Sequence, residues 1–365
     1  MNKFLSYGIG LVVVLLIVFL IVISFCGVNN SKIIKVGAIL PLSGNNAYIG
    51  EDLKKGIELA IQDSNDPIVL EIIYEDCAGS PVQAVNAYNL LKQKGVSMVV
   101  TAMSNITLAI APLAESDKMP VFTIAVATSI LNSGDYVFVN NFIGEEDINY
   151  LLQYISNKFD YNNLAIIASE AEFGKQYLGI LEKGWKAEGK KVVLKEVYPL
   201  NNVDFATIIL KLKDANPDVV YMIGYASELS EILIELKKQD VNLPVFSYWG
   251  AQEQTIINAA KIAAEGLIVT SSPFDEKTEP IFFKMFNEKY GYNPNYRAGL
   301  AYDIIKMYYY VGNICGSNKE CIKTELYKIK DFNGVTGLTT IVSDGGTLKP
   351  FAIWQVKDGQ FVKYE

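Results

Sequence analysis

Two consecutive blocks of the chain alternate apolar strand-like runs with amphipathic helix-like segments. In the opening unit, the largely apolar run 33–40 leads into a loop with two glycines, and residues 52–62 then carry apolar side chains at helical spacing. This alternation predicts parallel sheets with right-handed crossover helices, because parallel neighbours cannot be joined by tight hairpins. The predicted strands are residues 33–40, 68–74, 96–101 and 121–125 in the first block, and 164–168, 192–197, 219–223 and 245–248 in the second.

The fold class predicted from these blocks is α/β, with two doubly wound parallel-sheet lobes. A chain of 365 residues is too long for one ordinary core and suits two lobes. Later segments are helical in pattern at 279–289 and 298–312, and strand-like at 339–342, 351–356 and 361–364. If those helices join the first lobe and those strands the second, the chain crosses three times, near Asn140, Ser271 and Gly337, and forms a hinge. The predicted division is 31–140 plus 273–336 for lobe one and 141–272 plus 337–365 for lobe two.

Histidine is absent from the chain. Its absence removes the commonest general base and the commonest metal ligand, which disfavours hydrolytic catalysis and histidine metal sites. No Gly-x-Ser-x-Gly nucleophile elbow occurs. The formal charge of −8 argues against nucleic acid, whose phosphates require a stripe of lysine and arginine. We therefore predict no enzyme activity, no cofactor, no metal and no nucleic-acid partner.

Residues 1–30 differ in composition from the rest of the chain and are predicted to be a signal or anchor segment. Lys3 precedes an almost unbroken apolar run over 9–25, which at about 1.5 Å per residue nearly spans a bilayer. Cys26 stands where a lipoprotein signal would be cut and lipidated, whereas Phe25 occupies the preceding place, where a small residue is expected. Either an uncleaved apolar helix or a lipidated Cys26 would tether an extracytoplasmic protein to the cell membrane.

The remaining cysteines are Cys77, Cys315 and Cys321. Only five residues separate Cys315 from Cys321, so a small disulfide loop would suit an oxidising compartment. Two unpaired thiols beside a helix end are the alternative. No Cys-x-x-Cys pair occurs, which makes a zinc ribbon improbable.

Several short motifs spread over the chain form a recognisable set. They include the opening unit at 35–61, Tyr-Glu-Asp-Cys-Ala-Gly-Ser-Pro at 74–81, Ala-Pro-Leu-Ala-Glu at 111–115, Ala-Glu-Gly-Leu at 264–267 and Trp-Gln-Val-Lys-Asp-Gly-Gln-Phe at 354–361. Together they resemble the leucine/isoleucine/valine-binding family of periplasmic binding proteins of type 1, which serve ABC transporters. The resemblance covers nearly everything after residue 32. It implies a three-crossing hinge between two lobes and a ligand between them.

The loops that leave the strands are the predicted site, because ligands of open α/β sheets lie beyond the carboxyl ends of the strands. Ser104 and Asn105 precede a helix, whose free amides and a hydroxyl form a ready anion pocket. Thr128 adds a second hydroxyl from the neighbouring loop, where Val126 is a further candidate. The resemblance implies that residues at these places hold a ligand carboxylate. The alternative is that Ser104 and Thr128 only cap helices.

The remaining candidates come from the second block and from the first glycine loop. Tyr225 lies where the family places an aromatic ring over the solute, and Phe173 lies where a tyrosine is common. Family members that bind amino acids pair the ligand ammonium with a carboxylate at a place where this chain has Ala251 or Gln252, with Glu253 one step further on. Glu172 borders the same region, and Tyr48 is a candidate for the pocket that takes the ligand side chain.

The predicted function is an extracytoplasmic solute-binding protein of an ABC importer, which captures a small polar solute by hinge closure. The solute is an amino acid, with the branched-chain type favoured, or an amide or carboxylate. The expected partners are that solute, the ABC permease subunits and the membrane. The alternative is a ligand-sensing ectodomain of a signalling system, since the same two-lobed module serves receptors.

Overall fold

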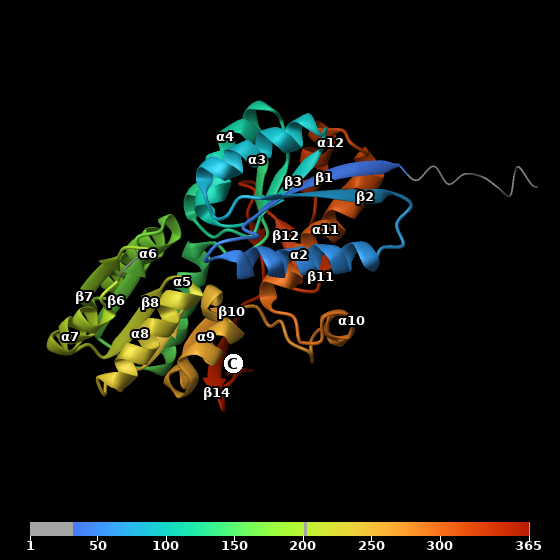
Figure 1. Ribbon diagram of the computed structural model, residues 1–365. Helices are drawn as coiled ribbons and strands as arrows, with labels where there is room; N and C mark the ends of the chain where they lie inside the picture. The colour runs from blue at the N-terminus through green and yellow to red at the C-terminus, as the bar shows by residue number, and fades with distance from the viewer. Residues whose placement is uncertain (1–31, 201–202, 365) are drawn as a thin grey trace, which may run out of the picture.

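The computed structural model describes residues 32–200 and 203–364, which form two lobes (Figure 1). The predicted apolar helix, and Cys26 with it, lies outside the described residues. Within the described part of the chain, no helix combines the length and the apolar character needed to cross a membrane. Each lobe is built around its own main sheet, and we call the lobe of β1–β5 lobe one and that of β6–β10 lobe two.

The sheet of lobe one is entirely parallel, in the order β2-β1-β3-β4-β5. Its strand β1 lies inside the sheet and is buried over its last five residues, as expected for an apolar strand covered on both faces. Helices α3 and α4 lie on one face, and α2 and α11 on the other (Figure 1). The bounds are β1 Ile33–Leu40, α2 Ala47–Gln62, β2 Val69–Asp76, α3 Pro81–Gln93, β3 Met98–Thr101, α4 Ser104–Ser116, β4 Val121–Thr123, η1 Thr128–Asn132 and β5 Val137–Val139.

The sheet of lobe two is mixed, in the order β15-β14-β10-β9-β8-β6-β7. Strands β6 to β10 are parallel, whereas β14 and β15 run antiparallel as a hairpin that turns at Asp358 and Gly359, both with positive φ. The strand-like segments predicted at 351–356 and 361–364 correspond to β14 and β15, which join the sheet of lobe two as expected and return as a hairpin on its edge. The bounds are α5 Gly144–Lys158, β6 Asn163–Ser169, α6 Glu172–Ala187, β7 Lys191–Tyr198, α7 Phe205–Ala215, β8 Val219–Ile223, α8 Ala226–Lys238, β9 Val245–Ser247, η2 Trp249–Ala251, α9 Gln254–Ala260, η3 Lys261–Ala264, β10 Ile268–Ser271, β14 Ala352–Lys357 and β15 Gln360–Lys363.

After β10 the chain returns to lobe one. Helix α11 packs along α2, and the hydroxyl of Tyr308 donates a hydrogen bond to the carbonyl of Val99 in β3 (2.9 Å). The segments of this return are α10 Pro280–Tyr290, α11 Tyr296–Cys315, α12 Lys319–Leu326, β11 Phe332–Gly334, β12 Gly337–Ile341 and β13 Thr347–Leu348.

The position of β12 differs from the expectation for residues 339–342. The strand pairs with β11 and β13 in a separate three-stranded sheet, so its predicted place among the strands of lobe two is wrong. The turn that follows β12 lies against lobe one, where the amide of Val139 donates to the carbonyl of Gly345 (2.8 Å). A hairpin pattern cannot reveal which sheet the hairpin joins. The division of the chain into lobes at residues 140, 272 and 336 stays a prediction.

A buried polar cluster lies beside the last predicted crossing, near Gly337. The Asp303 carboxylate of α11 accepts hydrogen bonds from the amides of Val335 (2.8 Å) and Thr336 (2.9 Å). Lys349 donates to the hydroxyls of Thr336 (2.8 Å) and Thr339 (2.7 Å). Burial raises the pKa of Asp303 and lowers the pKa of Lys349 to about 8. The cluster ties α11 to the segment that leads into the last crossing.

Cys315 and Cys321 form a disulfide, with their Cα atoms 5.5 Å apart. Of the two alternatives left open by the sequence, the structure therefore contains the disulfide and not two unpaired thiols. Cys77 is buried and free. The disulfide joins the end of α11 to α12 and closes the small loop predicted from the spacing. This covalent link holds α12 on lobe one.

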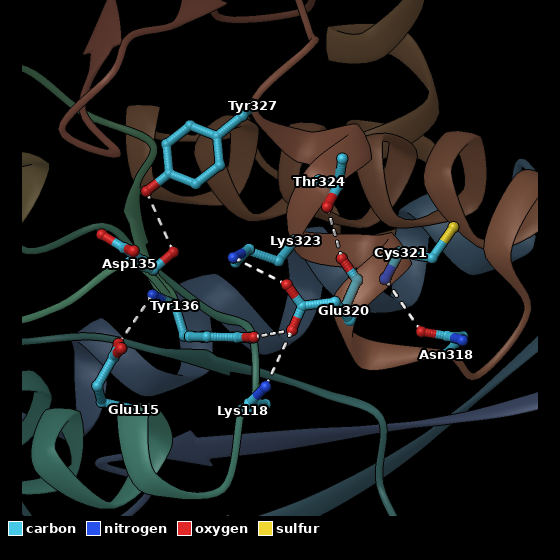
Figure 2. A network of polar contacts seen from close by, with 10 residues as sticks. All are labelled: Glu115, Lys118, Asp135, Tyr136, Asn318, Glu320, Cys321, Lys323, Thr324 and Tyr327. Atoms are coloured by element: carbon cyan, nitrogen blue, oxygen red, sulfur yellow. Dashed lines mark hydrogen bonds and ion pairs between the residues drawn. The ribbon is translucent and has the colours of Figure 1, made fainter.

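Polar contacts around α12 add to this link (Figure 2). The carboxylate of Glu320 accepts a hydrogen bond from the Tyr136 hydroxyl and pairs with Lys118 (3.7 Å) and Lys323 (3.0 Å). The hydroxyl of Tyr327 donates to the carbonyl of Asp135 (3.1 Å). These residues come from α12, from its C-terminal end and from the segments that precede β4 and β5, so they hold the return segment against the sheet of lobe one.

Candidate ligand-binding site

A cavity lies between the lobes, at the carboxyl ends of strands from both sheets. Lobe one contributes the loops after β3 and β4 and the first turn of α2. Lobe two contributes the segments after β6, β8 and β9, and α11 closes one side. The cavity is lined by Ile49, Met103, Ser104, Ile124, Ala125, Val126, Phe173, Tyr225, Tyr248, Trp249, Gly250 and Arg297.

The rim of lobe one is suited to an anion. Met103 turns the chain sharply between β3 and α4 with a φ of 66°, which is uncommon for a residue other than glycine. Among the described residues, no side chain caps the N-terminus of α4, whose first amides are therefore available to a ligand. The Ser104 hydroxyl accepts a hydrogen bond from the amide of Ala127 (3.3 Å) and so links this helix to the loop after β4. Amide donors and a hydroxyl at a helix N-terminus favour a carboxylate.

The wall of lobe two is aromatic. The ring centroid of Phe173 lies 5.2 Å from that of Tyr225 and 5.7 Å from that of Tyr248. The Tyr248 hydroxyl donates to the carbonyl of Gly224 (2.9 Å), and burial raises the pKa of both tyrosines, so they stay neutral. Gly250 allows this packing, because a Cβ there would lie 2.5 Å from the Tyr248 ring. The wall therefore suits an apolar ligand body.

A buried ion pair joins the two lobes beside the cavity. Arg297, in the first turn of α11, pairs with Glu253, which lies between η2 and α9. The two residues are only 4% and 5% exposed. The Arg297 guanidinium also donates to the carbonyl of Gly250 (3.4 Å), and it lies 5.3 Å from the ring centroid of Tyr48 and 5.4 Å from that of Trp249. Carbonyl, carboxylate and rings together hold the guanidinium in one place.

The predicted site residues do not all line this cavity. Ser104, Val126, Phe173 and Tyr225 do. Glu253 does not line the cavity itself, but it pairs with Arg297, which does. Asn105 faces an adjoining outer groove, where its side-chain amide donates to the carbonyl of Gly79 (3.3 Å).

The other candidates occupy different surroundings. Thr128 begins η1, and its buried hydroxyl has no hydrogen-bond partner among the described residues. Gln252 faces a separate groove lined by Phe274 and Tyr292. Glu172 is exposed and accepts a hydrogen bond from Gln176 (2.7 Å).

Direct contacts close the lobes over the cavity. The amide of Ala226, at the start of α8, donates to the hydroxyl of Tyr48 in α2 (3.5 Å). The side-chain amide of Gln176 in α6 donates to the Ser129 hydroxyl (2.9 Å), and its oxygen accepts from the Ser129 amide (3.4 Å). With the ion pair, these contacts join residues of lobe one to residues of lobe two at several points. The described arrangement is therefore a closed one.

Arg297 is the main site residue that the sequence reasoning missed. One signal could have revealed it, because the chain has 31 lysines and a single arginine. A guanidinium offers a planar set of donors and stacks on aromatic rings, which an ammonium does not match. The one arginine of such a chain was therefore a candidate for a role that lysine cannot fill, such as pairing and ring stacking in a binding site.

Two lobes that close over a cavity with an uncapped helix N-terminus on one side and an aromatic wall on the other are typical of a solute-binding protein. The family model described as periplasmic binding protein matches residues 33–360, so the chain belongs to this family. Membership confirms the resemblance noted in the sequence and the expected function in solute binding. It also implies a location outside the cytoplasm.

Similar proteins span most of the chain. Leu/Ile/Val-binding protein homolog 2 of Brucella abortus is 24% identical, over 91% of this chain and 92% of its own length. The structure of a leucine binding protein from Thermotoga maritima has a TM-score of 0.86 at 22% identity, over 91% of this chain and 98% of that one. A solute binding protein of an ABC transporter from Rhodopseudomonas palustris, in complex with 3,4-dihydroxy benzoic acid, has a TM-score of 0.82 at 20% identity, over 92% and 97%. Likeness at these identities shows the shared fold.

Proposed function

We propose that this protein captures a small solute with a carboxylate and an apolar body, and presents it to the permease of an ABC importer. The observation that carries the proposal is the two-sided construction of the cavity. Lobe one offers the Ser104 hydroxyl and the uncapped amides of α4, whereas lobe two offers the rings of Phe173, Tyr225 and Tyr248. Neither side alone would enclose such a ligand.

Hinge closure is the proposed mechanism. The solute first docks on the rim of lobe one, and contacts with lobe two then favour the closed state. Micromolar affinity requires roughly 8 kcal/mol, which charge-assisted hydrogen bonds and burial of a small apolar body can supply. The closed form would present a surface made of both lobes to the permease. Thr128, Asn105 and Tyr48 do not line the cavity and are proposed as further contacts.

The names of similar proteins favour solutes that share one feature. The relatives include proteins named for leucine, isoleucine and valine, and one structural neighbour holds a dihydroxybenzoic acid. All of these compounds join a carboxylate to an apolar body. A branched-chain amino acid and an amine-free carboxylate both meet that requirement. No observation favours the sensing alternative, and the N-terminal tether, by helix or by lipidated Cys26, remains part of the proposal.

The test is a thermal-shift screen of the full-length protein against amino acids, amides and short aliphatic and aromatic carboxylates. A bound solute raises the melting temperature by mass action. Ser104→Ala should weaken the binding of the best carboxylate by about 1–3 kcal/mol, because the variant removes one polar partner of an anion. Ser156→Ala, on the exposed side of α5, is the matched control. The proposal fails if no carboxylate shifts the melting temperature or if Ser104→Ala binds as tightly as the wild type.

A further inference from the structure

Glu253, the acid next to the place where the resemblance puts the partner of a ligand ammonium, is already paired with Arg297. The two side chains come from different lobes; Arg297 lines the cavity, whereas Glu253 does not line it and pairs with Arg297. A ligand ammonium could use Glu253 only by displacing the guanidinium. Arg297 would then be left buried beside the rings of Tyr48 and Trp249 without the carboxylate that pairs with it, which is unfavourable.

Other carboxylates do not replace Glu253 in this role. Glu172 is exposed and accepts a hydrogen bond from Gln176. Asp52 lies close enough to feel the charge of Arg297, but it accepts a hydrogen bond from Asn295 and does not line the cavity. Glu228 faces the outer groove, where the Ser227 hydroxyl donates to it (2.8 Å). Among the described residues that line the cavity, none is an acid.

We infer that this cavity selects carboxylates without an α-ammonium group, because Arg297 already supplies the positive charge that an amino acid would bring. The inference rests on the proposed function and narrows its solute class to hydroxy, oxo or unsubstituted acids with an aliphatic or aromatic body. The single arginine of the chain fits this role. Its guanidinium pairs with Glu253 and donates to the carbonyl of Gly250, and it lies over the rings of Tyr48 and Trp249.

The experiment compares ligands that differ only at the α-carbon, by isothermal titration calorimetry on the full-length protein. The first set is L-leucine, (S)-2-hydroxy-4-methylpentanoate and 4-methylpentanoate, and the second is L-phenylalanine and 3-phenylpropanoate. In the set that binds, the amine-free acids should bind at least about tenfold more tightly than the amino acid. Tighter binding of the amino acid would overturn the inference and leave the proposed function standing. Binding of neither set would overturn both.

Variants of the pair give a second readout. Arg297→Gln releases Glu253, so the affinity for the amino acid should rise. The preference for the amine-free acid over the amino acid should then reverse. The double variant R297Q/E253Q removes the freed carboxylate, so the gain should disappear. Arg297→Lys keeps the charge and should still discriminate against the amino acid. An unchanged preference in Arg297→Gln, with a normal melting transition, would contradict the inference. If that variant does not fold, the comparison of matched ligands on the wild type decides.

Discussion

Asp147 lies in the first turn of α5, close to the first predicted crossing between the lobes, and is completely buried. Its carboxylate accepts a hydrogen bond from the Tyr177 hydroxyl (2.9 Å). Burial penalises the charged form and raises the pKa of Asp147 to about 7. In the unfolded chain the same group has its ordinary pKa of 3.8.

This difference makes the stability depend on pH in a defined direction. Between the two pKa values the native protein holds the proton of Asp147 and the unfolded chain has released it, so raising the pH favours unfolding. The difference between about 7 and 3.8, at about 1.4 kcal/mol per pKa unit, is about 4 kcal/mol. The contribution of neutral Asp147 is fully present below pH 4 and is lost as the pH rises through about 7.

The assay is urea unfolding of the wild type and of Asp147→Asn between pH 4 and pH 8. Asparagine keeps an acceptor for Tyr177 but does not titrate. The free energy of unfolding of the variant, relative to the wild type, should therefore rise by about 4 kcal/mol across this range. Glu145→Gln, an exposed acid on the same turn, is the control and should change little. A difference between Asp147→Asn and the wild type that does not vary with pH would refute the reasoning.

Three further predictions concern the binding site, the close packing of Gly224 against Tyr198, and the disulfide. Tyr225→Ala should weaken solute binding at least several-fold by calorimetry, because it removes part of the aromatic wall, and unchanged affinity would place Tyr225 outside the site. Gly224→Ala should lower the melting temperature and cost roughly 1–3 kcal/mol, because its Cβ would lie 1.8 Å from the Tyr198 hydroxyl. Replacing Cys315 and Cys321 by serine should reduce the free energy of unfolding by about 2 kcal/mol, and treatment of the wild type with a reductant should reproduce that loss.

Much of the fold could be predicted because its signals are local. Residues 33–40 form β1 and residues 219–223 form β8 with the predicted bounds. Helix starts were less certain: α2 begins at Ala47, earlier than predicted, because its first turn lies in the glycine loop and lacks a side-chain cap. The short strand β5 and the helix α12 were missed, since so few residues carry little periodicity.

The candidate site could be predicted in part. Loops after the strands were expected to face the ligand, and Ser104, Phe173 and Tyr225 do line the cavity. Glu253 was considered as a partner for a ligand ammonium, and the structure shows that it already has a partner in Arg297. Arg297 lies in α11, more than one helix further along the chain than Glu253. Sequence spacing indicates contacts only within one helix or strand, so it could not connect these two residues.

The sequence by itself determined the α/β class, the two lobes and the ends of the strands at which a ligand would lie, because hydrophobic periodicity and turn residues act over a few neighbouring positions. The tertiary structure alone decided which charges meet, which sheet receives β12 and which side of its loop Gln252 faces. Those outcomes depend on how distant segments pack. Opposite charges that are remote in the chain, such as Glu253 and Arg297, become partners only when folding removes both from water.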